Sequence, residues 1–135
     1  KKINYCTGCS TCSLHHKPCP QKDDATEIID KMVAADVIVM ATPVYFYTMS
    51  AQMKTLIDRC CGLYTEMNDK EFYFIVTAAD DKEKMMRTVD TFQGFLDCLE
   101  NPTIKGVIFG LGVWHVGEIK GNPAMQEAYE TGKRV

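Results

Sequence analysis

Hydrophobic residues along the chain form short continuous runs that are separated by stretches of helical spacing. The runs are Val37–Ala41, Phe72–Val76 and Ile104–Leu111, and each has the length and residue types of a buried strand. The opening segment Lys2–Tyr5 is compatible with one more short strand. Because a continuous apolar run has no polar side, we expect these strands to be covered on both faces, with Pro43 ending pairing after the first run.

Four stretches of helical spacing lie between and after the runs. Each begins at a residue that can cap free backbone amides, namely Asp24, Ser50, Asp80 and Asn122. Glu27 and Glu83 complete capping boxes, and Pro123 suits a first helical position. The residues expected to face inward are Ile28, Ile29, Met32 and Val33, then Met53, Leu56, Ile57 and Cys60, then Met85, Val89, Phe92, Leu96 and Leu99, and finally Met125, Ala128 and Tyr129.

Strands and helices therefore alternate in the order β-α-β-α-β-α-β-α. This alternation predicts a parallel sheet between layers of helices, which is a three-layer α/β/α fold. Ligands of such sheets bind beyond the carboxyl ends of the strands. We therefore expect the functional residues in four loops, which are Cys6–Cys19, Thr42–Met49, Thr77–Asp81 and Gly110–Gly121.

Composition narrows the class of protein. The 135 residues carry a net charge of −3, and 46% of them are hydrophobic, which is typical of a single globular domain over residues 1–135. The absence of a basic run argues against a nucleic-acid partner. The longest uncharged stretch, Val37–Met53, is too polar to span a membrane. With no secretory signal at its start, we expect the protein in the cytoplasm.

Four of the seven cysteines are close together near the start of the chain. The pattern is C-x2-C-x2-C-x6-C-P, formed by Cys6, Cys9, Cys12 and Cys19. Such close spacing followed by Cys-Pro is typical of cysteines that ligate iron–sulfur clusters. Zinc could use the same four thiolates, or His15 or His16 in place of one, although zinc ligands usually form two separated pairs. The cysteines could also hold no metal, and a disulfide fits poorly with an intracellular protein.

A second constellation is the aromatic loop between the first apolar run and the second helix. Tyr45, Phe46 and Tyr47 could cover the face of a flat, amphipathic ring such as a flavin, while Thr42 and backbone amides bond its polar edge. The alternative is that these aromatic residues only pack under neighbouring loops.

The segment Asp36–Arg59 resembles the flavodoxin-like NAD(P)H-dependent FMN reductase family, in particular the branch with the iron–sulfur flavoproteins. The cysteine motif followed by Asp23 and Asp24 is similar too, and so is Gly117–Met125. The resemblance implies a flavodoxin-like sheet, FMN held by three loops, and a homodimer or homotetramer. The residues that it assigns to FMN are Thr42, Pro43, Val44, Tyr45, Phe46, Thr77, Ala78 and Ala79, and those that it assigns to a [4Fe-4S] cluster are Cys6, Cys9, Cys12 and Cys19.

The sequence departs from the family at its start. Family members begin with a central strand, a Ser/Thr-rich phosphate loop and a helix, and nothing in this sequence matches them. We therefore expect a flavodoxin-like domain without its first strand, phosphate loop and first helix, as in an N-terminally incomplete copy. Such a chain would contain only the ring half of the FMN site.

The resemblance implies an FMN-dependent oxidoreductase. It would take a hydride from NAD(P)H and pass electrons to a small molecule or protein, directly or through the cluster, without a protein acid or base. One alternative is an electron carrier with no enzymatic activity, and another is a metal-stabilised binding domain without flavin.

The remaining notable residues have structural interpretations. Lys54, Asp58 and Arg59 are interpreted as a solvated helix face with an intrahelical ion pair. Trp114, which follows the last run, is assigned to packing. The other three cysteines are expected to be small buried hydrophobes, and they are Cys60, Cys61 and Cys98.

Overall fold

The computed structural model describes residues 1–135 and contains a four-stranded sheet in the order β2-β1-β3-β4. The strands are β1 (Val37–Tyr45), β2 (Thr48–Met49), β3 (Glu71–Thr77) and β4 (Thr103–Gly110). The three long strands are parallel, whereas the two-residue β2 runs antiparallel to the end of β1. The parallel alternation predicted from the three apolar runs is thus confirmed.

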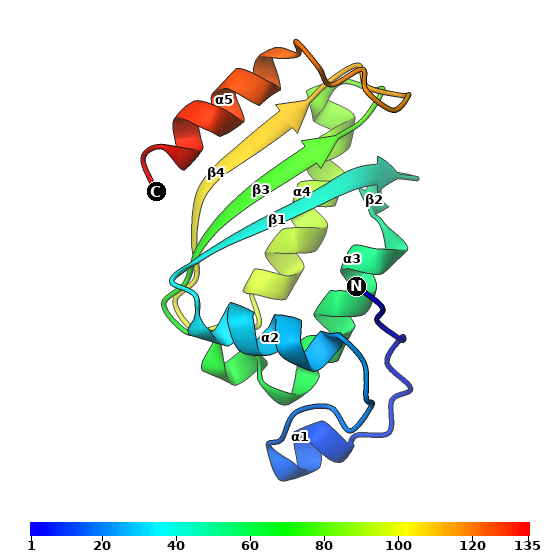
Figure 1. The fold of residues 1–135 in the computed structure, drawn as a ribbon, viewed down its shortest axis with the longest axis vertical. Coiled ribbons are helices and arrows are strands. Elements are labelled where there is room, and N and C mark those ends of the chain that lie inside the picture. The colour runs from blue at the N-terminus through cyan, green and yellow to red at the C-terminus, as the bar shows by residue number, and fades with distance from the viewer.

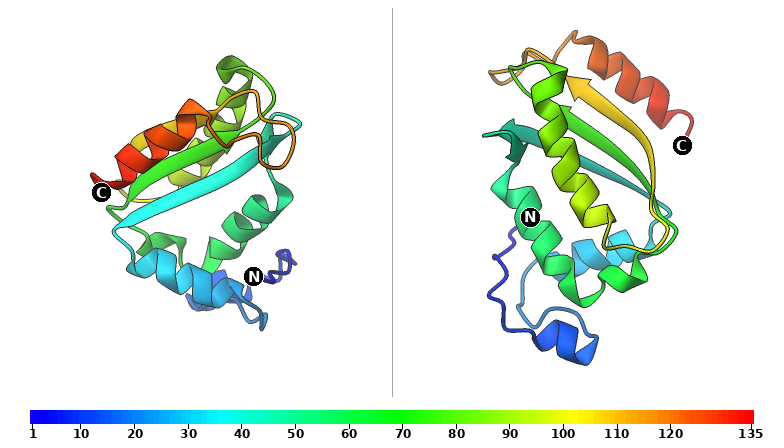
Figure 2. Two further views of the ribbon diagram at one scale, coloured as in Figure 1. Left: turned by 45° about the horizontal axis from the view of Figure 1, so that its top comes forward. Right: turned by 180° about the vertical axis from the view of Figure 1, so that it is seen from behind.

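Helices lie on both sides of this sheet (Figures 1 and 2). On one side α4 (Lys82–Leu96) packs against the strands and α3 (Ala51–Arg59) runs beside it, while α5 (Pro123–Gly132) lies on the other side over β4. The helix α2 (Ala25–Ala34) lies near the amino ends of the strands, and α1 (Thr11–His15) lies beyond it. Two short 3-10 turns, η1 (Cys60–Gly62) and η2 (Tyr64–Glu66), follow α3. None of the helices has the length and hydropathy of a membrane-crossing segment.

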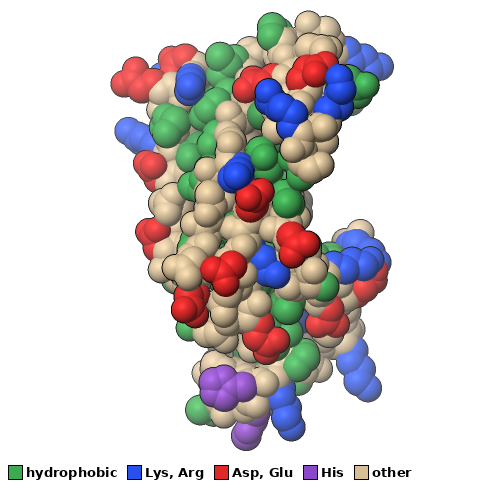
Figure 3. Space-filling model, turned by 90° about the vertical axis from the view of Figure 1, so that its left-hand side faces the viewer, with side chains coloured by type: hydrophobic (Ala, Val, Ile, Leu, Met, Phe, Trp, Pro, Cys, Tyr) green, Lys and Arg blue, Asp and Glu red, His purple; other side chains and the backbone are tan.

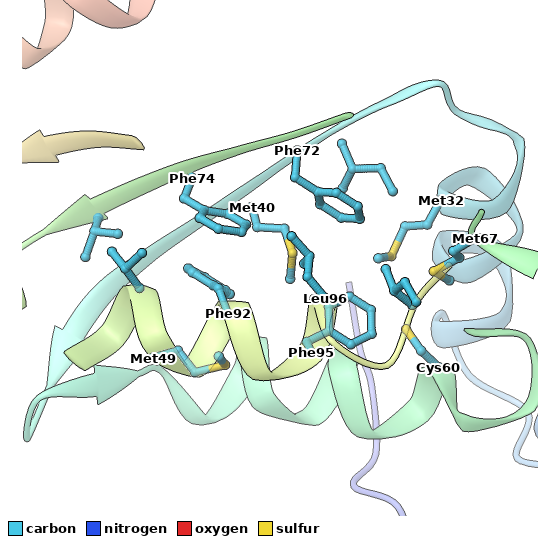
Figure 4. Packing of buried hydrophobic residues seen from close by; sticks show 14 of the residues in the cluster. Met32, Met40, Met49, Cys60, Met67, Phe72, Phe74, Phe92, Phe95 and Leu96 are labelled. Carbon is cyan, nitrogen blue, oxygen red and sulfur yellow. The ribbon is translucent and has the colours of Figure 1, made fainter. Parts of the chain in front are cut away.

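The hydrophobic core fills the space between the sheet and α4 (Figure 4). The rings of Phe74 and Phe92 stack with their centroids 4.7 Å apart, and Phe72 lies beside Phe74. The inward residues predicted for α4 are all buried. Those within the helix lie at helical spacing on the face that meets β3, and Leu99 lies beyond the end of the helix. The core therefore holds the strands in register and fixes where their carboxyl ends lie.

The opposite face of the sheet is open along β1, which contradicts the prediction that this strand is covered on both faces. Val39 is 57% exposed on β1, because α5 packs mainly against β4. Pro43 does not end pairing either, because it is in register with Thr77 and β1 continues to Tyr45. β2 pairs only with the last two residues of β1, so Pro43 lies in a strand whose outer edge is unpaired, where proline is tolerated.

The N-terminal residues form no strand, contrary to the expectation for Lys2–Tyr5. The backbone amide of Lys2 donates to the Asp24 carboxylate, and that of Asn4 donates to Asp23. Asp24 therefore precedes α2 as predicted but does not cap it, whereas Asp23 Oδ1 accepts the amide of Ala25 at 3.0 Å. Asp24, which was expected to cap the helix, instead holds the start of the chain, while Asp23 bonds both the helix and the start of the chain.

The starts of the other three helices agree better with the starts predicted from the sequence. Ser50 accepts the amide of Met53 and Asn122 accepts that of Ala124, as capping residues do. The cap of α4 is Asp81 rather than Asp80, a shift of one residue from the predicted capping box. In α5 the inward face was predicted wrongly, because Met125 and Tyr129 are exposed and Ala124 is buried instead.

Candidate functional site

A cavity of about 250 Å³ opens at the carboxyl ends of the strands, where the sequence predicted the ligand site. It lies among the turn between β1 and β2, the loop after β3 and the loop after β4 (Figure 1). Three of the four predicted loops are therefore brought together. The residues that line the cavity are Val44, Phe46, Tyr47, Ala78, Ala79, Asp80, Lys84, Met85 and Trp114.

The turn between β1 and β2 presents two aromatic residues in a strained backbone conformation. Because Tyr45 pairs with Thr48, only Phe46 and Tyr47 remain for the turn, and their φ angles are 50° and 63°. Glycine or asparagine usually fills such positions, and a bulky residue there costs about 1–2 kcal/mol. The side chain of Phe46 is fully exposed, and the Arg87 guanidinium lies 5.2 Å from the ring centroid of Tyr47. Strain of this kind is typical of turns that present side chains to a ligand.

The loop after β3 contributes small side chains and free backbone donors. The amide of Ala78 donates to Gly110 O at 3.0 Å, and that of Val113 donates to Ala78 O at 2.8 Å, so this loop is fixed to the loop after β4. The amides of Ala79 and Asp80 have no acceptor in the chain. The cavity thus offers room and hydrogen-bond donors on the same side.

One ion pair lies at the rim of the cavity. Lys84 Nζ is 2.6 Å from Asp80 Oδ1. The hydrogen bond between them lowers the pKa of the Asp80 carboxyl and raises the pKa of the Lys84 ammonium, so both are charged at neutral pH. Lys84 is therefore a cation that the electron-rich edge of a ring could contact.

The residues predicted to hold a ring divide into two groups. The structure places Val44, Phe46, Ala78 and Ala79 on the cavity wall. It places the other four elsewhere, namely Thr42, Pro43, Tyr45 and Thr77. Tyr45 lines a different groove, on the far side of the turn.

The Thr42 hydroxyl forms two hydrogen bonds within the chain. This buried group accepts the amide of Ser50 at 2.9 Å and donates to Pro43 O at 2.8 Å. This hydroxyl therefore connects β1 to the start of α3, and in this arrangement it is not free to bond a ligand.

Tyr47, which was predicted to cover the ring face, also lines the cavity. Four lining residues were not among the predicted ring contacts, and they are Asp80, Lys84, Met85 and Trp114. The assignment of Trp114 to packing was wrong, because its side chain is 78% exposed at the edge of the cavity. Its backbone amide donates to Glu118 Oε2 at 2.7 Å, which fixes the loop after β4. The position of Trp114 inside the fourth predicted loop is the signal that could have identified it.

The cysteine loop lies at the other end of the molecule. Figure 1 shows α1 beyond the amino ends of the strands, and Figure 3 shows histidine side chains at this protruding tip. The prediction that Cys6–Cys19 joins the other three loops is therefore wrong for this arrangement. The sequence order of strands and loops did not reveal that a buried ion pair fixes this loop next to the end of α3.

That ion pair joins Arg59 of α3 to Asp23. Arg59 Nη1 is 2.7 Å from Asp23 Oδ2, Nη2 is 3.0 Å from Asp23 Oδ1, and Nη1 also donates to Asn4 O at 2.7 Å. Arg59 is only 2% exposed, so interpreting it as part of a solvated face was wrong. The intrahelical pair of Lys54 and Asp58 is confirmed. Hydrogen bonds from Arg59 hold the pKa of the Asp23 carboxyl far below its ordinary value.

The four cysteines of the motif do not converge. Cys6 and Cys9 are exposed, Cys12 is buried against Gly62 of η1, and Cys19 lies beside Arg59. Burial raises the pKa of the Cys12 thiol, whereas hydrogen bonding with Thr11 lowers that of Cys9. No three His, Cys, Asp or Glu side chains lie close enough to share a metal ion. This arrangement does not fit a cluster with four thiolate ligands.

The remaining cysteines differ in burial. Cys60 is buried as predicted, and burial raises its pKa to about 12, so the thiol stays protonated. Cys61 and Cys98 are exposed, contrary to the prediction.

Gly62 is expected to control how the cysteine loop packs. A Cβ at this position would lie 2.4 Å from Lys17 O and 2.8 Å from Cys12 Cβ. We expect Gly62→Ala to destabilise the packing by about 2 kcal/mol, as overpacking does, and to increase the alkylation rate of Cys12 by iodoacetamide. Peptide mass spectrometry measures that rate. Gly94→Ala is the control, since its Cβ meets nothing within 4 Å. Equal Cys12 alkylation in all three proteins would contradict the packing described.

The comparisons with known proteins identify the family of the chain. The model of the family described as NADPH-dependent FMN reductase matches residues 4–115. The chain belongs to the NADPH-dependent FMN reductase family. An iron–sulfur flavoprotein from Methanosarcina thermophila is 30% identical over 144 residues, which cover 100% of this chain and 72% of that protein. The family predicted from the segment Asp36–Arg59 is thus confirmed.

Other iron–sulfur flavoproteins match over shorter segments of this chain. An iron–sulfur flavoprotein from Archaeoglobus fulgidus is 51% identical over 59 residues, or 44% of this chain and 26% of the relative. Across five such proteins the match spans only 26% to 32% of the relative's length.

Solved structures show the flavodoxin-like fold. The Trp repressor binding protein from Bacillus subtilis has a TM-score of 0.68 at 24% identity, and the match covers 78% of this chain and 72% of that one. The apo form of an NADH:FMN oxidoreductase has a TM-score of 0.58 at 14% identity, covering 82% of this chain and 60% of that one. At these identities the likeness concerns the fold alone.

Proposed function

We propose that the protein is an FMN-dependent oxidoreductase that takes a hydride from NAD(P)H and passes the electrons to a small molecule or a protein. The observation that carries this proposal is the cavity at the carboxyl ends of the strands. Its wall combines a strained aromatic turn with two adjacent alanines, which leaves a space suited to a flat ring.

The residues of the cavity would bind and orient the flavin ring. Bound FMN supplies the redox chemistry, since it accepts a hydride and releases electrons to an acceptor. Phe46 and Tyr47 would flank the ring, and the free amides of Ala79 and Asp80 would donate to its polar edge. Lys84 would place a positive charge near that edge.

Anaerobic titration with FMN, followed by an assay of NADH and NADPH oxidation with a benzoquinone as acceptor, tests the proposal. We expect the protein to quench the fluorescence of FMN and to accelerate oxidation of the nicotinamide. FMN binding without accelerated oxidation would favour the electron carrier. Absence of FMN binding would overturn both functions.

The iron–sulfur cluster is a separate question. Its support is the cysteine spacing and the names of the relatives, while the separation of the four thiols argues against it. Cys12 would have to leave its place against η1 before it could join Cys6, Cys9 and Cys19 around one cluster. Iron and sulfide analysis of anaerobically purified protein decides this point independently of FMN binding. All seven cysteines are free thiols, which supports the cytoplasm as the site of action.

A further inference from the structure

A pair of thiols connects the cysteine loop to the turn that follows α3. The side chain of Cys12, on α1, is only 8% exposed and packs against η1, where a Cβ on Gly62 would lie 2.8 Å from Cys12 Cβ. The thiol of Cys61, the preceding residue of η1, hydrogen-bonds with that of Cys12. Burial and this neighbouring thiol raise the pKa of Cys12. Cys12 therefore has a thiol partner outside the C-x2-C-x2-C-x6-C-P motif.

The two adjacent cysteines of η1 differ in what they can react with. Cys60 is 1% exposed, and its Sγ donates to Leu56 O at 3.3 Å. Burial raises the pKa of the Cys60 thiol to about 12, so this thiol is protonated and inert. Cys61 is exposed and lines a groove of about 860 Å³ between α3 and α4. Of the two, Cys61 is therefore the one that a dissolved molecule can reach and that also contacts a second thiol.

Access through the groove decides which thiol of the pair is oxidised first. Attack on a dissolved disulfide requires a thiolate and an open path. Cys12 has neither, because it is buried and its pKa is raised. Cys61 has the open path, and a groove of this volume is large enough to admit a small organic molecule. Oxidation of Cys12 therefore has to proceed through Cys61.

We propose that Cys12 and Cys61 are a dithiol that reacts with low-molecular-weight disulfides and closes into a reversible disulfide between α1 and η1. The Cys61 sulfur attacks one sulfur of the small disulfide RSSR, the S–S bond of RSSR breaks, and a first RSH leaves with the proton of Cys61. The Cys12 sulfur then attacks the Cys61 sulfur of the mixed disulfide, and the second RS group leaves as RSH with the proton of Cys12. Two protein thiols are oxidised, and one RSSR is reduced to two RSH.

The new bond would attach the cysteine loop covalently to the rest of the chain. In the reduced protein this loop is held by buried contacts, among them the ion pair of Asp23 and Arg59. A bond between Cys12 and Cys61 adds a constraint that survives the loss of this ion pair. Structural disulfides are rare in reducing compartments, but transient ones occur there as redox sensors. The proposal depends neither on flavin binding nor on a metal.

Anaerobic incubation of the reduced protein with glutathione disulfide tests the pair. Free thiols are then blocked with N-ethylmaleimide, and non-reduced tryptic peptides are analysed by tandem mass spectrometry. Trypsin releases the two halves of the expected link as separate peptides, Ile3–Lys22 and Cys60–Lys70. We expect the link between Cys12 and Cys61 to form about tenfold faster than any other, because these two thiols are already in contact, and dithiothreitol to reverse it. A dominant link between any other two cysteines, or no link within the chain, would overturn the proposal.

Three variants separate the two steps of the reaction. Cys12→Ser should stop at the mixed disulfide, with glutathione retained on Cys61. Cys61→Ser should leave Cys12 as a free thiol, because the buried sulfur can no longer be oxidised through its neighbour. Cys98→Ser is the matched control, since Cys98 is exposed in the same groove, and it should form the expected link at the wild-type rate.

Circular dichroism shows whether each of these variants is folded. Cys61→Ser changes an exposed side chain, so it remains informative even if the substitution of the buried Cys12 unfolds the protein. Oxidation of Cys12 at an unchanged rate in Cys61→Ser would show that the proposed pair is wrong.

Discussion

Replacing Asp23 with asparagine should lower the free energy of unfolding by about 3–5 kcal/mol, the usual effect of removing one partner of a buried ion pair. Asp23 and Arg59 form two hydrogen bonds, and their side chains are only 4% and 0% exposed. The variant would leave the guanidinium buried without a counter-charge. Chemical denaturation followed by circular dichroism measures the change.

Glu27→Gln is the matched control for this variant. Glu27 also pairs with two lysines, Lys1 and Lys31, but all three side chains are exposed, so water replaces the lost contact and little change is expected. Equal losses of stability in the two variants would refute the view that burial makes the Asp23 pair strong.

The same pair predicts how stability depends on pH. The pKa of Asp23 is lowered from an ordinary 3.8 in the folded protein, so its contribution is complete above that value and is lost as the pH falls below it. The wild type should therefore lose stability in acid more steeply than Asp23→Asn. Denaturation curves at a series of acidic pH values provide the test, and parallel curves for the two proteins would contradict it.

Replacing Ala79 with tryptophan should weaken FMN binding about 100-fold or more, which corresponds to about 2.7 kcal/mol. Ala79 is an exposed residue on the wall of a cavity of about 250 Å³, and an indole there would occupy the space assigned to the ring. The effect is on binding and not on folding, because Ala79 makes no contribution to the core. Quenching of FMN fluorescence measures the affinity.

Ala34→Trp is the control for this substitution, since it adds the same indole to an exposed position at the end of α2, away from the cavity. Circular dichroism should show that both variants are folded. Unchanged FMN affinity in Ala79→Trp would place the flavin somewhere other than this cavity.

The local pattern of hydrophobic residues predicted most of the strands and helices, but it did not predict which of their faces pack together. The runs at Phe72–Val76 and Ile104–Leu111 became parallel strands because residue type and length are local properties. The run at Val37–Ala41 looked the same, yet one side of it is exposed, since a continuous apolar run does not record which face a helix covers. Arg59 looked like a solvent residue because its partner Asp23 lies 36 residues earlier in the chain.

For the candidate site too, the sequence predicted the location but not the contacts between residues that are distant in the chain. The rule that ligands bind at the carboxyl ends of strands located three of the loops, because it depends only on strand direction. It could not reveal that the Thr42 hydroxyl is already used by Ser50, or that Lys84 reaches the rim from the first turn of α4. The cysteine spacing indicated ligand chemistry but not the burial of Cys12 against another element.

The unpaired edge of β1 has a consequence for how the protein associates under stress. Val37–Tyr45 contains no charged residue, and β2 pairs only with its last two positions. Charged residues normally protect an edge strand from extending into a foreign sheet, and here Pro43 is the one residue in the strand that resists such extension. When heating or dilute denaturant loosens the neighbouring helices, β1 is the segment at which strand addition between molecules begins. In the fold of residues 1–135, we therefore expect aggregation to start at this edge, before the core around Phe74 is exposed.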